Sequence, residues 1–192
     1  PLFHRAIMES GAPTARAVYP YDHPLHQKQF EEFLQKTGTS NISEGQVMSY
    51  LRSLPVCTIV SASLAIFDKY DPSLRWPFQP VIEGPGGYIS KPPIDAWRSR
   101  DWHKMPILTG FNTNEGAMFV PTNMSNSSEF REFFHILLPA LSKSDLDSLE
   151  LLYLDPLTHP SSSPYLETRR GLGAQFKRVE AAYAQFAYIA PI

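Results

Sequence analysis

Two short apolar segments of the chain are predicted to form β-strands. The first runs from Arg5 to Ser10, with apolar residues ahead of the turn residues that follow. The second runs from Pro106 to Gly110 and is bounded by proline and glycine, as a buried strand of a mainly parallel sheet is. Such sheets carry their chemistry where strands end. The polar residues that follow each strand are therefore the first candidates for a functional site.

Most of the remaining chain shows the spacing of apolar residues that is typical of helices. Ser43 with Gln46 has the pattern of a capping box, and Ser144 is predicted to be the N-cap of a later helix. The predicted helices cover residues 24–37, 43–53, 55–67, 129–138 and 142–154, and residues 165–190 are expected to hold a long helix or a helix pair broken near Gly171 and Gly173.

The polar turn after the second strand presents one carboxylate, that of Glu115, which is a candidate catalytic acid. This segment resembles the one that carries the acidic triad member in type-B carboxylesterases, the family of cholinesterases and fungal lipases. In that family a strand is followed by the pattern Gly-x-x-x-x-Glu-Gly-x-x-Phe. Here Gly110, Glu115, Gly116 and Phe119 match it.

Two further blocks are similar to the same family and occur in the family's order. Residues 1–13 resemble the segment with the pattern Leu-Phe-x-x-Ala-Ile-x-x-Ser-Gly, which follows the helix behind the nucleophilic serine. Residues 78–97 resemble the stretch Phe-x-Pro-Val-x-Asp-Gly and a later proline, with Glu83 at the position of the usual Asp. Three blocks in the right order make a stronger signal than any one of them.

The resemblance implies an α/β fold in which residues 1–192 form the central part of a single α/β-hydrolase domain. About two strands of the sheet would be present, with many helical excursions. The implied activity is hydrolysis of a carboxylic ester by a serine nucleophile, with Glu115 as the triad acid. Ser10 would lie beside this acid, or would instead cap its own turn, and Phe119 would contribute to the substrate pocket.

The nucleophile and the base of such a triad are not recognisable. No Gly-x-Ser-x-Gly elbow occurs, and Ser10 has Met8 where the first glycine of an elbow is needed. The triad order restricts the histidine to His135 or His159, and neither lies in the family's Gly-x-x-His-Gly context. We therefore expect an internal piece of a longer enzyme that is inactive alone. The alternatives are a non-catalytic cholinesterase-like adhesion or binding module and a truncated pseudoenzyme.

Charge and composition narrow the partners. A net charge of -2 without a basic cluster argues against nucleic acid, no apolar run has the length of a membrane span, and no pattern suggests a metal or another cofactor. The expected partner is a small-molecule ester or a lipid substrate. The single Cys57 is expected to be unpaired and buried, or paired outside these residues.

Three glycosylation sequons fit a secreted protein, and a cytoplasmic esterase is the alternative. Their acceptor residues are Asn41, Asn123 and Asn126, of which the last two are too close to be modified together reliably.

Overall fold

A computed structural model describes residues 2–14, 18–84 and 86–191 of the chain. The chain divides into two compact units, and each is considered by itself. The first contains Pro1–Ala17 and Pro93–Ile192, and the second contains Val18–Pro92.

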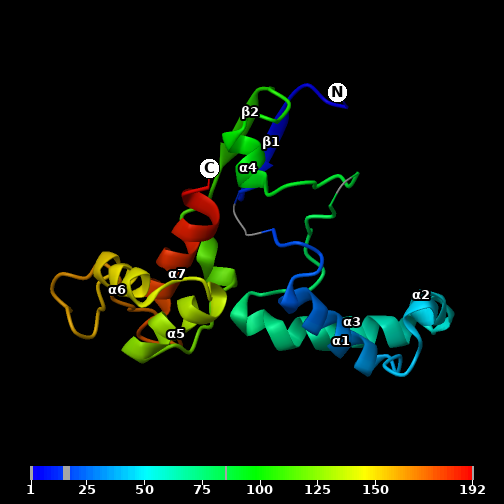
Figure 1. Cartoon of the computed structure of the whole chain (residues 1–192). Helices are drawn as coiled ribbons and strands as arrows, with labels where there is room; N and C mark the ends of the chain where they lie inside the picture. The colour runs from blue at the N-terminus through cyan, green and yellow to red at the C-terminus, as the bar shows by residue number, and fades with distance from the viewer. Residues whose placement is uncertain (1, 15–17, 85, 192) are drawn as a thin grey trace. The chain divides into compact units, whose positions relative to one another are not determined.

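The first unit contains a parallel sheet that has two strands in the described part of the chain, β1 (Ala6–Glu9) and β2 (Ile107–Gly110). Figure 1 shows these strands side by side although about a hundred residues separate them. Ala6 lies opposite Ile107 and Glu9 lies opposite Gly110, so both strands end at the same edge. The prediction of two parallel strands at these positions is confirmed.

The prediction that the second strand is buried is wrong for the described residues. All four residues of β2 are exposed, and Leu108 keeps 66% of its surface accessible. On β1, Ile7 keeps 69%. With only two strands described, no neighbouring strand or helix layer covers these apolar side chains.

The other regular elements of the first unit are helical, and long loops connect them. They are α4 (Pro93–Arg98), the 3₁₀ turn η2 (Glu115–Met118), α5 (Ser127–Leu137), α6 (Lys143–Leu152), α7 (Phe176–Ala184) and the π-helical turn η3 (Gln185–Ile189). Helix α5 packs against α6, and α7 packs against η2. The core of this unit is aromatic, because Phe130, Phe134 and Tyr183 are almost completely buried.

Helix α6 begins earlier than its predicted N-cap. The N-cap is Ser142 and not Ser144: the Ser142 hydroxyl accepts a hydrogen bond from the backbone N–H of Asp145 at 3.2 Å. The Asp145 carboxylate in turn accepts one from the N–H of Ser142 at 2.8 Å. This reciprocal pair is a capping box, which satisfies two N–H groups at the helix start.

The long helix or helix pair predicted for residues 165–190, with a break near Gly171 and Gly173, is only partly present, because regular helix starts after that break, at Phe176. The backbone N–H groups of Gly173 and Gln175 donate to the carbonyl groups of Thr122 and Met124, at 2.8 and 2.9 Å. A Cβ on Gly173 would lie 2.0 Å from the Met124 carbonyl oxygen, so only glycine permits this approach. These contacts hold the segment in a non-helical path until α7 begins.

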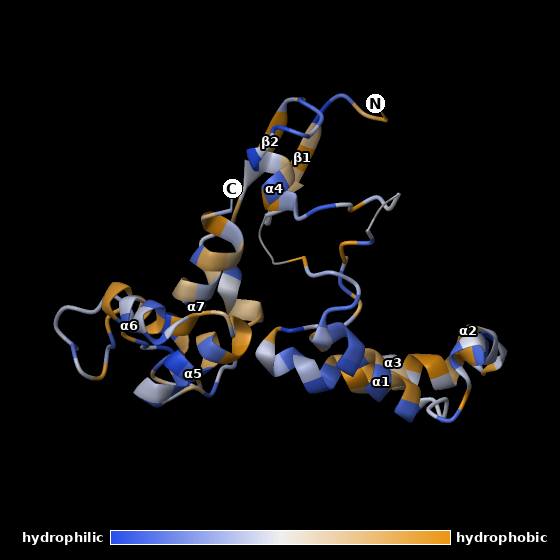
Figure 2. Cartoon of the chain, in the orientation of Figure 1, coloured by the Kyte–Doolittle hydropathy of each residue, from blue (hydrophilic) through white to orange (hydrophobic). Residues whose placement is uncertain are grey.

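The second unit consists of α1 (Pro24–Lys36), α2 (Glu44–Ser53), α3 (Val56–Tyr70) and the short turn η1 (Asp71–Ser73). Helices α1 and α3 pack together around Phe33, Ala62 and Ile66. Figure 2 shows further apolar positions along α3, and several of them are exposed: Val56, Val60, Leu64 and Phe67. The predicted capping box at Ser43 is wrong, because its hydroxyl donates to the Gln46 side-chain oxygen at 2.9 Å and caps no backbone N–H.

No single helix among the described residues combines the length and apolar character needed to cross a bilayer. Glu44–Ser53 and Val56–Ser73 meet that test only as a pair, and the pair is bent by 114°.

Candidate functional site

The candidate site lies where the two strands end. Ser10 follows β1 directly, and its backbone N–H continues the strand pairing by donating to the Gly110 carbonyl oxygen at 2.9 Å. Glu115 lies five residues after the end of β2 and is the first residue of η2. Because parallel strands have their carboxyl ends at one edge, residues remote in sequence meet here. The structure thus brings together Ser10 and Glu115, two of the residues singled out from the sequence.

One oxygen of the Glu115 carboxylate is held by three donors. Oε1 accepts from the Ser10 hydroxyl at 2.5 Å, from the backbone N–H of Asn112 at 2.5 Å and from the Asn112 side-chain amide at 3.1 Å. The second oxygen, Oε2, accepts no hydrogen bond from any residue in the ranges 2–14, 18–84 and 86–191. The carboxylate is therefore fixed in orientation while its second oxygen is available to another donor.

The same contacts favour the charged form of Glu115. The backbone N–H of Asn112 lowers the pKa of its carboxyl group most, the Ser10 hydroxyl lowers it further, and partial burial opposes both. A donor to a carboxylate stabilises the ionised state. Glu115 is consequently an anion at neutral pH, as an acceptor for an imidazole N–H must be.

Ser10 reaches Glu115 through an uncommon backbone conformation. Its φ angle is 65°, and that of Gly11 is 82°. Non-glycine residues enter this left-handed region at a cost, and such residues cluster at functional sites. The conformation directs the Ser10 hydroxyl to Glu115 and not to a backbone group of its own turn.

Helix α7 supports the turn that carries Glu115. A Cβ on Gly116 would lie 2.3 Å from the carbonyl oxygen of Glu180, so the glycine allows the two backbones to touch. One turn further along both elements, the Phe119 ring lies 5.9 Å from that of Tyr183. Phe119 also stacks on Tyr188 at 5.7 Å. In this structure Phe119 fixes η2 to the helix, and its contact with a substrate stays a prediction.

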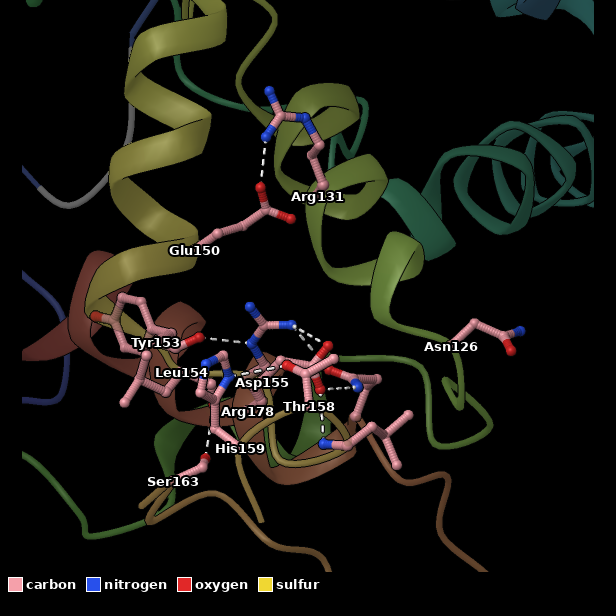
Figure 3. Close-up of polar contacts among 12 residues, drawn as sticks. Asn126, Arg131, Glu150, Tyr153, Leu154, Asp155, Thr158, His159, Ser163 and Arg178 are labelled. Atoms are coloured by element: carbon pink, nitrogen blue, oxygen red, sulfur yellow. Dashed lines mark hydrogen bonds and ion pairs between the residues drawn. The ribbon is translucent and has the colours of Figure 1, made fainter. Parts of the chain in front are cut away.

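A buried polar cluster anchors α7 (Figure 3). The Arg178 guanidinium donates to the Tyr153 carbonyl oxygen at 2.7 Å and to the Gln175 side-chain oxygen at 3.1 Å. It also forms an ion pair with Asp155 at 3.6 Å and lies 4.0 Å from the centre of the Phe130 ring. This cluster was not expected from the sequence, and it orients the helix behind the candidate site.

The two histidines allowed by the triad order are not part of the site. His135 is exposed on α5, as predicted for the edge of an apolar helix face. His159 is exposed in a loop, where its Nδ1 is 2.9 Å from the Thr158 hydroxyl. No histidine of the described part of the chain hydrogen-bonds Glu115.

The other predicted positions are distributed over the surface. The sequon residues Asn41, Asn123 and Asn126 are all exposed. Cys57 is exposed and has no disulfide partner among the described residues, so the first alternative, an unpaired and buried cysteine, is wrong, and pairing outside these residues stays a prediction. Among the residues that the structure describes, no cluster of His, Cys, Asp or Glu side chains has the geometry to hold a metal ion.

Sequence reasoning missed Asn112 and Glu180. The position of Asn112 in the sequence could have indicated its contact with Glu115. An asparagine in a turn, three residues before the glutamate, commonly forms hydrogen bonds with nearby backbone or side-chain groups. Glu180 is a single acid in an otherwise largely apolar helix segment, Val179 to Ala184, and its burial depends on contacts that the local pattern does not show.

Comparison with known proteins identifies a family for almost the whole chain. Residues 1–183 match the sequence model of the carboxylesterase family. Secreted lipase 4 of Gibberella zeae is 34% identical over 191 residues, a match that covers 99% of this chain and 34% of that protein. Lipase 4 of Diutina rugosa is 26% identical over 195 residues, covering 100% of this chain and 34% of that protein.

A solved structure confirms the predicted fold class. The crystal structure of Aspergillus niger EstA superimposes with a TM-score of 0.75 and 24% sequence identity, covering 99% of this chain and 34% of that one. The two strands and the helices therefore correspond to part of an α/β-hydrolase fold. The chain spans about a third of the length of the curated relatives it matches.

Proposed function

Because the chain belongs to the carboxylesterase family, we propose that it supplies Glu115 as the acid of the catalytic triad of a serine ester hydrolase. The nucleophilic serine and the histidine of this triad lie outside residues 1–192 of the sequence. The 192-residue chain by itself is accordingly expected to be inactive.

The orientation of the Glu115 carboxylate carries this proposal. Three donors hold Oε1, and Oε2 accepts no hydrogen bond from the described residues. An acid that orients a catalytic histidine needs this arrangement, because one oxygen must receive the imidazole N–H while the rest of the group stays fixed. A solvated turn residue has no need of three converging donors.

The reaction follows from the roles of the three groups. The serine hydroxyl attacks the ester carbonyl carbon, and the histidine takes its proton. The alcohol leaves with that proton, and water then attacks the acyl-enzyme and releases the carboxylic acid. Glu115 holds the histidine in one tautomer and stabilises its positively charged form in both steps. The proposed substrate is a small-molecule ester or a lipid, in keeping with the lipases among the relatives.

The test is replacement of Glu115 by Gln in the full-length protein that contains this chain. We expect kcat for a p-nitrophenyl ester to fall on the order of 10⁴-fold, as it does when the acid of a serine protease triad is changed from Asp to Asn. Glu31→Gln is the matched control, since Glu31 is an exposed helix residue of the second unit. A Glu115→Gln enzyme that keeps kcat within about tenfold of wild type would overturn the proposal. A wild-type protein that neither hydrolyses the ester nor reacts with a fluorophosphonate would instead support the non-catalytic alternative.

Secretion is a second part of the proposal. It is supported by the exposure of all three sequon asparagines and by the similarity to a secreted lipase. Expression in a secretory host followed by enzymatic removal of N-glycans should shift the electrophoretic mobility. Ser128→Ala removes the sequon of Asn126 and leaves that asparagine in place as the α5 N-cap. An unshifted band for the wild type would contradict glycosylation.

A further inference from the structure

Asn112 lies in the turn between β2 and η2, two residues after Gly110 and three before Glu115. It donates to Oε1 of Glu115 twice, through its backbone N–H at 2.5 Å and through its side-chain Nδ2 at 3.1 Å. The hydroxyl of Ser10 reaches the same oxygen from the other strand. The contact of Asn112, by contrast, lies within the turn itself and does not depend on the pairing of β1 with β2.

The side-chain donor of Asn112 is the part of this contact that the residue type decides, because any residue except proline supplies a backbone N–H. This donor is a neutral amide. Among the cationic side chains that the structure describes, none forms an ion pair with Glu115. A cation at this place would offset the charge of the carboxylate and weaken its attraction for a protonated imidazole. A neutral amide fixes the carboxylate and leaves its charge in place.

We propose that Asn112 is a positioning residue for ester hydrolysis: its side-chain amide holds Oε1 of Glu115 so that Oε2 faces the catalytic histidine. This inference rests on the proposed role of Glu115. The terminal torsion of a glutamate side chain is soft, so a carboxylate without such a donor exchanges its two oxygens easily. Displacements of about 1 Å in catalytic constellations reduce rates by up to about 100-fold.

The experiment compares Asn112→Leu with Asn112→Asp in the full-length protein that contains this chain. Both changes keep the backbone N–H donor and remove the amide. Leucine replaces the amide by an apolar group, whereas aspartate keeps the shape of asparagine and turns a second carboxylate toward Glu115. If Asn112 only fills space, aspartate is the milder change. If it acts as a donor to Glu115, aspartate is the more harmful one.

The expected losses are measured with a p-nitrophenyl ester, with kcat expressed per active site titrated by a fluorophosphonate. We expect Asn112→Leu to lower kcat about 3- to 10-fold with little change in KM, and Asn112→Asp to lower it about 10- to 100-fold. Because a neighbouring carboxylate opposes ionisation of Glu115, the fall of kcat/KM on the acidic side should begin at a higher pH in Asn112→Asp than in wild type.

Asn114→Leu and Asn114→Asp are the matched controls. Asn114 is exposed in the same turn, and its side chain caps no backbone N–H of η2. Both control variants should keep the kcat and the pH profile of wild type. A wild-type kcat in Asn112→Leu would overturn the inference, as would a smaller loss in Asn112→Asp than in Asn112→Leu. Equal losses at positions 112 and 114 would also overturn it, because the turn as a whole would then be responsible.

A double variant separates this inference from the proposed function. In the Glu115→Gln background, Asn112→Leu should cause no further loss, because Asn112 acts through Glu115. Full activity of Glu115→Gln itself would refute the proposed function. A large effect of Glu115→Gln together with an additive effect of Asn112→Leu would refute only the role of Asn112.

Discussion

The hydroxyl group of Ser10 donates to Oε1 of Glu115 at 2.5 Å across a sequence separation of 105 residues. This contact joins the ends of the two parallel strands through their side chains, immediately beyond the last backbone hydrogen bond from Ser10 to Gly110. Since the second unit is inserted between β1 and β2 in the sequence, the contact depends on the pairing of the strands. Strand register and the orientation of the candidate acid are therefore coupled.

Removal of this hydroxyl should weaken catalysis without abolishing it. In Ser10→Ala, Glu115 keeps the two donors of Asn112 but loses one of its three hydrogen bonds. A hydrogen bond to a charged group contributes about 1.5–3 kcal/mol, and partial compensation by Asn112 or water leads us to expect a fall in kcat of about tenfold. Because a donor that stabilises the anion is lost, the pKa of Glu115 should rise, and activity should be lost at a higher pH on the acidic side.

The matched control is Ser53→Ala. Ser53 donates to the Tyr50 carbonyl oxygen at 2.7 Å in an exposed part of α2, so this variant also loses one hydroxyl hydrogen bond. The pH profile of kcat/KM should shift in Ser10→Ala and not in Ser53→Ala. Identical profiles for all three proteins would argue against a contribution of Ser10 to the site.

Gly116→Ala should be far more harmful than its single added methyl group suggests. The new Cβ would lie 2.3 Å from the backbone oxygen of Glu180, and backbone atoms cannot withdraw as a flexible side chain does. Overpacking of this kind costs about 1–3 kcal/mol, and it would separate η2 from α7. We expect a lower midpoint of thermal unfolding together with a loss of activity.

Gly45→Ala provides the control for this substitution. Gly45 lies in the first turn of α2, where a Cβ meets no atom within 4 Å. Alanine is the better helix former by roughly 0.5–1 kcal/mol, so this variant should be as stable as wild type or slightly more stable. Equal stability of the two alanine variants would contradict the close approach at Gly116.

The parts of the structure that depend on the local spacing of apolar residues could be predicted from the sequence. The two strands and most helices follow from apolar spacing, and the meeting of Ser10 with Glu115 was expected from the family resemblance. Where two neighbouring residues both have the pattern of a helix N-cap, the sequence pattern does not say which of them caps the helix. Ser142 and Ser144 are each followed three residues later by an aspartate, and the second aspartate, Asp147, instead pairs with Lys143 and Arg131.

The features that the sequence did not predict depend on contacts between remote segments. A long helix or helix pair was expected for residues 165–190, but backbone hydrogen bonds to Thr122 and Met124 hold residues 173–175 in a non-helical path. The burial of Arg178 and Glu180 likewise depends on how α7 packs, and a charged residue in a helix is ordinarily expected to be exposed. Propensity describes a segment by itself, and tertiary contacts override it.

Replacement of Arg178 by Met should be strongly destabilising. The Arg178 side chain is only 2% exposed and compensates the charge of the buried Asp155, which would remain unpaired. Breaking one side of a buried pair costs about 3–5 kcal/mol. Denaturant unfolding of the full-length protein measures the loss.

Two comparisons test the cause of that loss. Arg131→Met removes an arginine that pairs with Asp147 and Glu150 in a more exposed position, and it should cost no more than about 1 kcal/mol. The double variant Arg178→Met with Asp155→Leu should be more stable than Arg178→Met alone, since the carboxylate left unpaired by the single change is then absent. A double variant that is less stable than the single one would show that packing, and not the unpaired carboxylate, dominates.

Glu167 should make the stability of the protein depend on pH in the acidic range. The Arg169 side chain lowers the pKa of the Glu167 carboxyl group most, and the pKa falls to about 2 although burial opposes it. A group whose pKa is lower in the folded state contributes stability above its unfolded pKa, near 4.5, and this contribution is lost as the pH falls toward 2. Glu167→Gln should therefore be less stable than wild type at neutral pH. The difference should be about 1 kcal/mol, because Arg169 is half exposed and solvent screens the pair.

Thermal unfolding of both proteins from about pH 7 to about pH 3 should show the two midpoints converging as the pH falls. A difference that stays constant over this range would mean that the charge of Glu167 does not contribute.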